Sequence, residues 1–382
     1  MDSVLVERFL RLCLCSRWDA DAKAAVSNML AAGQVNWAAV VEAALHARVA
    51  PLLYQIVRAE KSAPPDAIQT LRAGYELTLR YNLYLFGELQ RVLRALNAQA
   101  VPVIILKGAA LAHAVYGDVG LRPLRDLDLY VPLDAVPRVE RILQELGYAV
   151  PRVETQGGAA LAFESQLRVL KTAPLLSQIE IHWSLIDSPF YQTHLANEWF
   201  WNTALPCSVA NEPARMLGPE AQTLYLCAHL LLHHGGSNLL WLNDVAEVIR
   251  FYCAQLDWEE LLSRAPSLAL TLPPRIILPQ VAEEWGAPIP SNVVAKLREL
   301  PVARDESRVA RALTTPGRSP LQRFWHDLWS LPSWKKRFSF ALVNLFPSPE
   351  YMRQRYGVTN PFLVALAYPY RWWRGVWEAL TR

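Results

Sequence analysis

Cysteine is scarce in this chain and follows no ligand or disulfide pattern. Only five of the 382 residues are Cys, and the sequence contains no CxxC pair. The five lie in apolar segments with helical spacing, where a free Cys behaves as a small hydrophobe. This usage is typical of a reducing compartment, and we therefore expect a cytoplasmic protein.

A strong net charge and a long hydrophobic run are also missing. The formal charge of +3 results from 38 basic and 35 acidic residues, a balance too even for a protein that wraps a nucleic-acid duplex. The longest apolar runs, at 338–346 and 362–370, are about half of the roughly 20 residues that a membrane-spanning helix needs. The N-terminus has an acid at position 2 and arginines in its apolar stretch, unlike a signal peptide. The sequence thus predicts no membrane span and argues against a nucleic-acid partner.

Helical spacing dominates both ends of the chain, and strand patterns lie between them. Apolar residues recur at helical spacing from Asn36, a candidate N-cap, and again in a long segment that ends near Asn97. Short β-branched or alternating runs follow, and beyond them the pattern is almost wholly helical. The expected strands occupy 101–108, 125–132 and 178–185.

These patterns predict an α+β protein in which a small mixed sheet is embedded in mostly helical N- and C-terminal regions. A break with two prolines at 61–67 marks the first boundary. We expect four parts: a helical N-terminal region (1–65), an α/β core (66–188), a helical domain (189–310) and a basic, aromatic-rich helical C-terminal region (311–382).

The most informative stretch is "RDLDLY" at 125–130, where two aspartates stand one residue apart. In a strand, Asp126 and Asp128 point to one face while Leu127 and Leu129 point to the other. Two carboxylates on one face repel each other and favour a cation between them, and a divalent metal such as Mg²⁺ or Mn²⁺ is the natural occupant. The alternative interpretation is a solvated strand face, balanced by the arginines beside it.

Candidate phosphate ligands surround this pair. A strand is expected to end just before Lys107, and Gly108 would let the backbone turn into a helix whose N-terminal N–H groups attract anions. Lys107 adds a positive charge, although a solvated lysine at a strand end is the alternative. Arg122 and Arg125 flank the aspartates and can bind phosphate oxygens bidentately. These four residues are the predicted nucleotide-binding set.

A third carboxylate is predicted by the alternating stretch "QIEIHW". If Ile179 and Ile181 face the core, Glu180 lies on the opposite face together with His182. A strand next to 125–130 would then bring Glu180 to the two aspartates and complete a two-metal site. An exposed strand glutamate and a structural histidine are the alternatives.

Four stretches carry a resemblance to a known family: "LKGAAL", "VYGDVGLRPLRDLDLYV", "IEIHW" and "LCAHLLLHHGGSNLLWLNDVAEVI". With them the chain resembles an uncharacterised bacterial nucleotidyltransferase family of the polymerase-beta-like superfamily, over most of residues 35–255. The resemblance implies a nucleotidyltransferase fold for the α/β core. It also implies that Asp126, Asp128 and Glu180 are the catalytic metal carboxylates, and that Lys107 and Gly108 belong to the nucleotide loop. The chain departs from the wider superfamily in having a single glycine there and a longer interval before Asp126.

The helices after the third strand supply candidates for the acceptor side of the site. His229 and His233 share one helix face in "AHLLLHH", and a Gly-rich turn leads from there to Trp241 and Asp244. We expect these four residues and His182 to wall an acceptor pocket, with Asp244 orienting a histidine. A purely structural cluster and a dedicated metal site formed by the histidines are the alternatives.

The C-terminal region combines tryptophan with positive charge. Residues 321–382 hold six of the 14 Trp and nine Lys or Arg against three acids. This mixture is typical of contact with a membrane surface or with an acidic partner. Core packing with snorkelling cations is the alternative.

Together these features predict an NTP-dependent, two-metal-ion nucleotidyltransferase. It would move a nucleoside monophosphate to a hydroxyl or phosphate acceptor and release pyrophosphate, with Mg²⁺ or Mn²⁺ as the cofactor. Two alternatives stay open. One is a γ-phosphotransferase, and the other is a non-catalytic scaffold or membrane-peripheral adaptor with a transferase-like fold.

Overall fold

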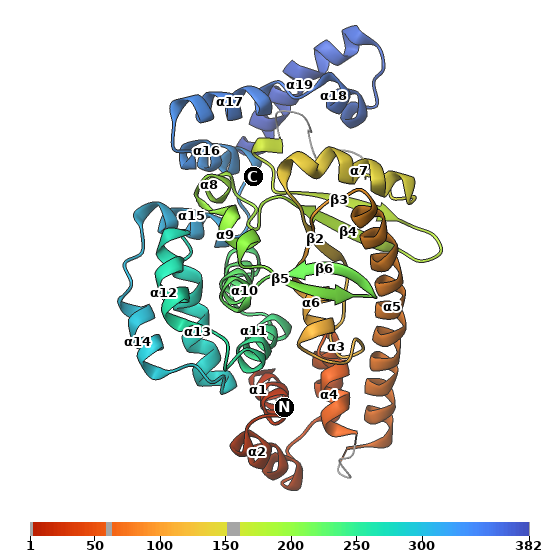
Figure 1. Ribbon diagram of the computed structural model, residues 1–382, viewed down its shortest axis with the longest axis vertical. Helices are drawn as coiled ribbons and strands as arrows, with labels where there is room; N and C mark the ends of the chain where they lie inside the picture. Colours follow the sequence, from red (N-terminus) through yellow and green to blue (C-terminus); the bar gives the residue numbers. More distant parts are fainter. Residues whose placement is uncertain (1–2, 59–62, 151–160, 382) are drawn as a thin grey trace.

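The computed structural model describes residues 3–58, 63–150 and 161–381. Within these ranges the chain forms a six-stranded mixed sheet surrounded by helices, so the α+β class is as predicted (Figure 1). The spatial order of the strands is β3-β4-β2-β1-β6-β5. The strands are β1 (Ile104–Ile105), β2 (Leu127–Tyr130), β3 (Gln166–Lys171), β4 (Ser177–His182), β5 (Leu205–Val209) and β6 (Glu212–Met216).

The three expected strands form the middle of the sheet as β1, β2 and β4. β2 pairs antiparallel with β1 and parallel with β4. The side chains of Leu127, Leu129, Ile179 and Ile181 are fully buried in a core with the helices on one face. The residues that alternate with them on β2 and β4 therefore point to the opposite face, as the sequence pattern predicts.

The expectation of an almost wholly helical chain after the third strand is wrong for residues 205–216. A hairpin of β5 and β6 lies there, and β6 pairs in parallel with β1. Ala210 and Asn211 at its tip both have positive φ, as a two-residue hairpin turn requires. Pro206 and Pro213 interrupt the strand pattern, which is why the sequence does not reveal it. β3 is likewise not among the expected strands.

Helices α5, α6 and α7 cover one face of the sheet. They span Pro65–Ala98, Lys107–Ala114 and Val136–Glu145, with the short turn η1 (Leu133–Ala135) before α7. Their buried aliphatic side chains share a hydrophobic core with the strands. α5 confirms the long helix that was predicted to end near Asn97. It begins inside the predicted break at 61–67, of which residues 61 and 62 lie outside the described ranges.

A second hydrophobic core lies between the N-terminal helices, the helices that follow β4, and the strands β1 and β2. It contains residues from the N-terminal helices, from the helices between β4 and residue 314, and from the two strands, such as Ile104 and Tyr130. Asn36 caps α3 by accepting from the N–H of Ala39, as predicted. A left-handed residue, Arg48 (φ 62°), then separates α3 from α4. These helices are α1 (Ser3–Cys15), α2 (Ala20–Ala31), α3 (Trp37–His46), α4 (Ala50–Val57), α8 (Pro189–His194), α9 (Asn197–Asn202), α10 (Pro219–His234), α11 (Leu239–Phe251), α12 (Trp258–Ser267), α13 (Leu272–Trp285), α14 (Ser291–Glu299) and α15 (Arg304–Thr314).

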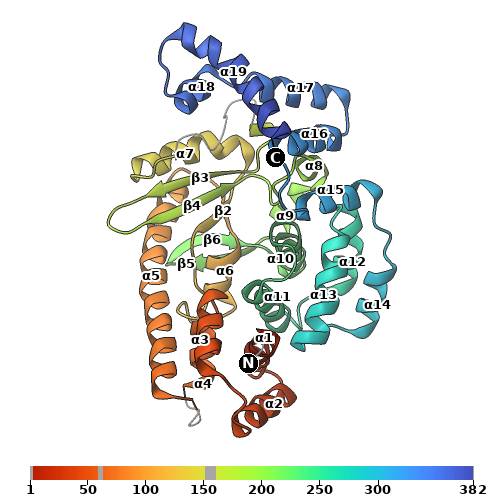
Figure 2. The same cartoon turned by 180° about the vertical axis from the view of Figure 1, so that it is seen from behind.

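The last four helices gather at one end of the molecule, seen in blue from both sides in Figures 1 and 2. They pack around small clusters of their own, and all six Trp of residues 321–382 are at least 36% exposed. Core packing therefore does not account for these Trp, and contact with a membrane surface or an acidic partner stays a prediction. Among the described helices, none combines the length and hydrophobicity needed to cross a bilayer. The four helices are α16 (Pro320–Ser330), α17 (Trp334–Leu345), α18 (Pro349–Tyr356) and α19 (Pro361–Leu380).

Asn82, on α5, fixes the loop that leads into β2. Its side chain is fully buried. Nδ2 donates to the carbonyls of Val119 and Arg122, the latter at 2.8 Å, and Oδ1 accepts from the N–H of Leu124 at 3.2 Å. One amide thus binds three backbone groups of the loop to the long helix.

Replacing Asn82 by Ala should leave these loop groups buried without partners. Each unsatisfied buried group costs about 1 to 3 kcal/mol, so we expect Asn82→Ala to lower the free energy of unfolding by about 2 kcal/mol or more, measured by urea denaturation. The exposed Asn28 on α2 provides the control, and Asn28→Ala should stay within about 0.5 kcal/mol of wild type. Equal effects of the two substitutions would contradict the role given to Asn82.

Candidate functional site

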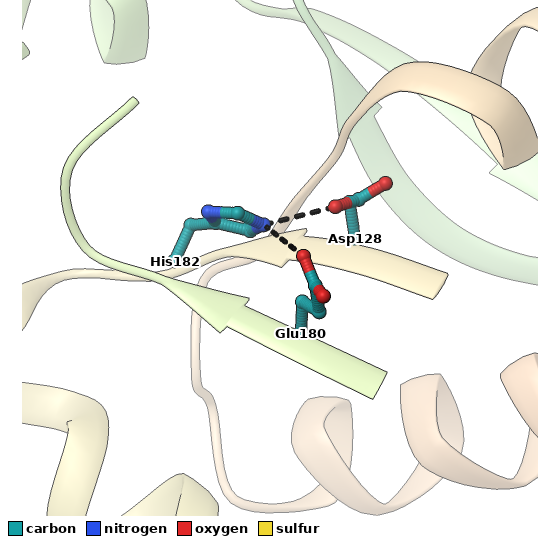
Figure 3. Close-up of side chains that lie close together, drawn as sticks. All are labelled: Asp128, Glu180 and His182. Atoms are coloured by element: carbon teal, nitrogen blue, oxygen red, sulfur yellow. Dashed lines mark hydrogen bonds and ion pairs between the residues drawn. The ribbon is translucent and has the colours of Figure 1, made fainter. Parts of the chain in front are cut away.

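Two neighbouring strands bring two carboxylates and a histidine together. In the parallel register of β2 and β4, Asp128 lies opposite Glu180, and His182 follows on β4. Nε2 of His182 lies 2.9 Å from Oδ1 of Asp128 and 3.7 Å from Oε2 of Glu180 (Figure 3). The prediction that these two strands are neighbours is confirmed.

Asp128 carries a negative charge inside the protein. Its side chain is 3% exposed, and Nζ of Lys107 lies 2.8 Å from Oδ1. Burial alone would raise the pKa of Asp128, but Lys107 and the hydrogen bond from His182 hold this pKa far below its ordinary value. The charge of Asp128 in turn raises the pKa of Lys107 against the effect of burial. Both groups are therefore charged at neutral pH.

The three side chains have the chemistry of a metal site. In the described parts of the chain, Asp128, Glu180 and His182 form a group whose ligand atoms lie within 4.8 Å of one another. Burial and the charge of Lys107 lower the pKa of His182, so its ring is neutral. Burial and the charge of Asp128 raise the pKa of Glu180 to about 7. Two carboxylates and a neutral imidazole fit a divalent cation.

Asp126 lies beside this group and outside it. It immediately precedes β2 and is half-buried, and burial together with the charge of Asp128 raises its pKa. Asp126 and the three-residue group line one cavity of about 340 Å³. The cavity is also lined by the four predicted phosphate ligands Lys107, Gly108, Arg122 and Arg125, and by the predicted wall residues His229, His233 and Trp241.

The turn from β1 into α6 positions Lys107. Lys107 has a φ of 45°, so the left-handed turn falls on this residue and not on Gly108, where it was expected. Gly108 is needed for a different reason. A Cβ at Gly108 would lie 2.7 Å from Cδ2 of Leu124 and 3.0 Å from Nη1 of Arg122. The absent side chain lets the loop before β2 pack against the start of α6.

The sequence of the chain matches the model of a family described as uncharacterised nucleotidyltransferase over residues 33–285. The chain belongs to this nucleotidyltransferase family. The match spans more than half of the chain, contains all six strands of the described sheet, and confirms the resemblance drawn from the motifs. No curated protein and no solved structure matches the chain.

In this member of the nucleotidyltransferase family, Arg122 and Asp244 form a buried ion pair behind the cavity. Nη2 of Arg122 donates to Oδ2 of Asp244 at 2.7 Å, and Oη of Tyr116 donates to Oδ1 at 2.7 Å. Within the described residues, the carboxylate of Asp244 binds these two groups and does not line the cavity. The expectation that Asp244 orients a histidine is therefore wrong. The pair joins α11 to the loop before β2 and holds Arg122 at the cavity wall.

The histidines of α10 form an uncharged aromatic wall. His229 stacks on His233 with ring centroids 5.3 Å apart, and His234 stacks on Trp241 at 3.6 Å. The surrounding protein desolvates these rings and lowers the pKa of His229, His233 and His234 below the ordinary value of histidine. The positive charge of the cavity is therefore supplied by lysine and arginine.

Several lining residues carry no signal in the sequence. Arg48 follows α3, and its Nη2 donates to the carbonyl of Pro123 at 2.9 Å. Burial lowers the pKa of Arg48 to about 10, which leaves it charged at neutral pH. Its position results from packing of the N-terminal helices against the loop before β2, and no motif marks it. The other unpredicted residues of the cavity include Ser165, Gln166, Ser184, Asp187 and His234.

The raised pKa of Glu180 predicts that metal binding releases protons. A carboxylic acid must ionise to bind a cation, so Mn²⁺ should displace up to about one proton at pH 6 and almost none at pH 8.5. Calorimetric titrations in two buffers of different ionisation enthalpy measure this number. The pH-dependent release should vanish in Glu180→Gln, and equal release at both pH values in the wild type would contradict the prediction.

Removing Asp244 should destabilise the protein because the guanidinium of Arg122 would stay buried without its partner. We expect Asp244→Ala to lower the free energy of unfolding by about 3 to 5 kcal/mol, measured by urea denaturation. The double variant Arg122→Met with Asp244→Leu removes both charges and should recover part of this loss. If Asp244→Ala behaves like Asp134→Ala, a substitution at an exposed position, the ion pair has no structural role.

Proposed function

We propose that this protein is a metal-dependent nucleotidyltransferase that moves a nucleoside monophosphate from an NTP to a hydroxyl or phosphate acceptor. Pyrophosphate would be the second product. The observation that carries the proposal is the group of Asp128, Glu180 and His182 in a cavity lined by cations, in a chain of a nucleotidyltransferase family. We further propose that the mixed sheet belongs to the polymerase-beta-like type.

The residues around Asp128 suit a divalent cation of the Mg²⁺ or Mn²⁺ type. Asp128 and Glu180 would hold it, with Asp126 available for a second position and His182 as a further ligand or as the donor that orients Asp128. When bound, such a cation neutralises phosphate charge and orients the reacting oxygen. Lys107 keeps Asp128 ionised, so this carboxylate is ready to bind at any pH near neutrality.

The cations of the cavity suit a triphosphate. Lys107, Arg48, Arg122 and Arg125 all line it. Ammonium and guanidinium groups donate charge-assisted hydrogen bonds to phosphate oxygens. They stabilise the charge that develops on the phosphates during transfer, and positions that are fixed in advance make this stabilisation larger. The ion pair with Asp244 fixes Arg122 in this way.

The reaction would exchange one bond at the α-phosphorus for another. The acceptor oxygen forms a bond to this phosphorus, the bond from it to the bridging oxygen of the β-phosphate breaks, and pyrophosphate leaves. When the acceptor is a hydroxyl, its proton passes to a base. Glu180 has a pKa of about 7 and would suit this step if it accepts the proton in place of holding the cation. His229, His233 and Trp241 would contact the acceptor.

Asp128→Asn should abolish transfer, because the amide cannot replace the buried charge. We expect turnover to fall by roughly 10² to 10³-fold or more, measured as transfer of label from an α-labelled NTP to small molecules of a cell extract. Since Lys107 would lose its ion partner in this variant, Glu180→Gln offers a second test that leaves the Lys107 pair intact. Asp134→Asn, at an exposed position, is the matched control and should equal wild type.

The products separate this function from its two rivals. Pyrophosphate supports nucleotidyl transfer, whereas a nucleoside diphosphate would assign a γ-phosphotransferase. If calorimetry finds no Mg²⁺-dependent binding of any NTP, the protein is a scaffold or adaptor and the proposal fails.

A further inference from the structure

A second cavity, of about 350 Å³, adjoins the catalytic cavity. Asp187 and His233 line both, so the two spaces meet at these residues. Beside this cavity, α16 packs against α8, so the C-terminal helices reach this part of the molecule (Figure 1). Its walls include the end of α10, the segment between α15 and α16, and parts of α16 and α17.

Arg318, in the wall of this second cavity, has buried nitrogen atoms without acceptors. Its Nε and Nη1 are out of contact with solvent and have no hydrogen-bond partner among the described residues. A guanidinium keeps its charge when it is desolvated, and a buried N–H donor without an acceptor is costly. An anion that reaches Arg318 would remove this cost.

A second guanidinium lines the same cavity. Arg323 stands in the first turns of α16 and is exposed. Burial lowers the pKa of Arg318, Asp327 opposes this effect, and the charge of Arg323 adds to it. Both arginines line the one cavity, so an anion bound there can contact both.

The acids of this cavity already have partners. Asp187 accepts a hydrogen bond from Oγ of Ser165 at 2.6 Å, and Oδ1 of Asp327 lies 3.4 Å from Nδ1 of His326. Glu164 also takes part in an interaction. Among the described residues that line the cavity, the buried polar atoms without a hydrogen-bond partner are Nε and Nη1 of Arg318. Both are N–H donors, which favours a ligand with anionic acceptor oxygens over a cationic one.

We propose that the second cavity binds the acceptor substrate by an anionic group, a carboxylate or a phosphate ester, which Arg318 and Arg323 hold. The acceptor would extend past Asp187 and His233 and present its reactive oxygen beside Asp128 and Glu180. Guanidinium groups bind both kinds of anion through paired hydrogen bonds. This inference rests on the proposed nucleotidyl transfer and names the class of acceptor that it uses. Arg318 and Arg323 lie beyond residues 33–285, so the family match does not include them.

Direct binding of small anions tests the subsite without any transfer reaction. The full chain is first saturated with Mg²⁺ and a non-hydrolysable NTP analogue, so that the catalytic cavity is filled, and is then titrated with inorganic phosphate or, in a separate arm, with acetate. We expect saturable binding of at least one of these anions, with an affinity that falls at least tenfold in Arg318→Gln. Arg311→Gln, at an exposed position on α15, should match wild type.

The same titrations without nucleotide separate failure of the subsite from failure of the proposed function. If the protein binds an anion through Arg318 but binds no NTP, the anion site exists and its proposed role in nucleotidyl transfer is wrong. Binding that is equal in wild type and Arg318→Gln, or absent for both anions, would overturn the subsite while leaving nucleotidyl transfer untouched.

The charge of the natural acceptor gives a second readout. Small molecules of a cell extract are passed over an anion-exchange resin, and the retained and unretained pools are offered to the enzyme with an α-labelled NTP. We expect labelled product from the retained pool, and a higher KM for that pool in Arg318→Gln with little change in kcat. Labelled product from the unretained pool alone would overturn the proposal.

Discussion

The buried negative charge of Asp128 is the constraint on which the rest of the site depends. A carboxylate removed from water needs a cation and hydrogen bonds beside it, and Lys107 and His182 supply them. The left-handed turn at Lys107 and the parallel register of β2 and β4 both serve this arrangement. In the proposed enzyme, Asp128 would bind a divalent cation in place of Lys107, and the ammonium of Lys107 would then be available to a phosphate. Lys107 and the divalent cation would then be alternative partners of the carboxylate of Asp128.

The cavity separates groups of fixed charge from groups that titrate. Its arginines stay positive across the neutral range, even where burial lowers the pKa, as at Arg48. The histidines of α10 stay neutral there, because their pKa values lie below the ordinary value. Glu180, with a pKa of about 7, is a lining carboxylate that changes charge near neutrality. In the proposed enzyme, the attraction of phosphates to these cations would depend little on pH, whereas binding of a cation by Glu180 would depend on it.

Sequence reasoning succeeds here where a side-chain pattern has one geometric meaning. Alternation at 178–182 predicts that Glu180 and His182 share a face, and the strand pairing brings them to Asp128. It fails where position depends on distant packing. Arg48 reaches the cavity only because the N-terminal helices pack against the loop before β2. Asp244 was predicted to orient a histidine, and in the structure it pairs with Arg122. Asp244 and Arg122 pair where both side chains are buried, and the local sequence pattern does not predict that burial.

The pairing of β6 with β1 limits which shorter pieces of the chain can keep an intact sheet. Residues 212–216 come late in the chain, yet they pair with β1 near the middle of the sheet. A recombinant piece that stops at residue 188 keeps β1 to β4 but leaves β1 with unpaired backbone N–H and C=O groups along an open side. Such open sides recruit strands from other molecules. A piece that retains the whole described sheet therefore has to reach at least Met216, and shorter pieces will tend to self-associate in solution.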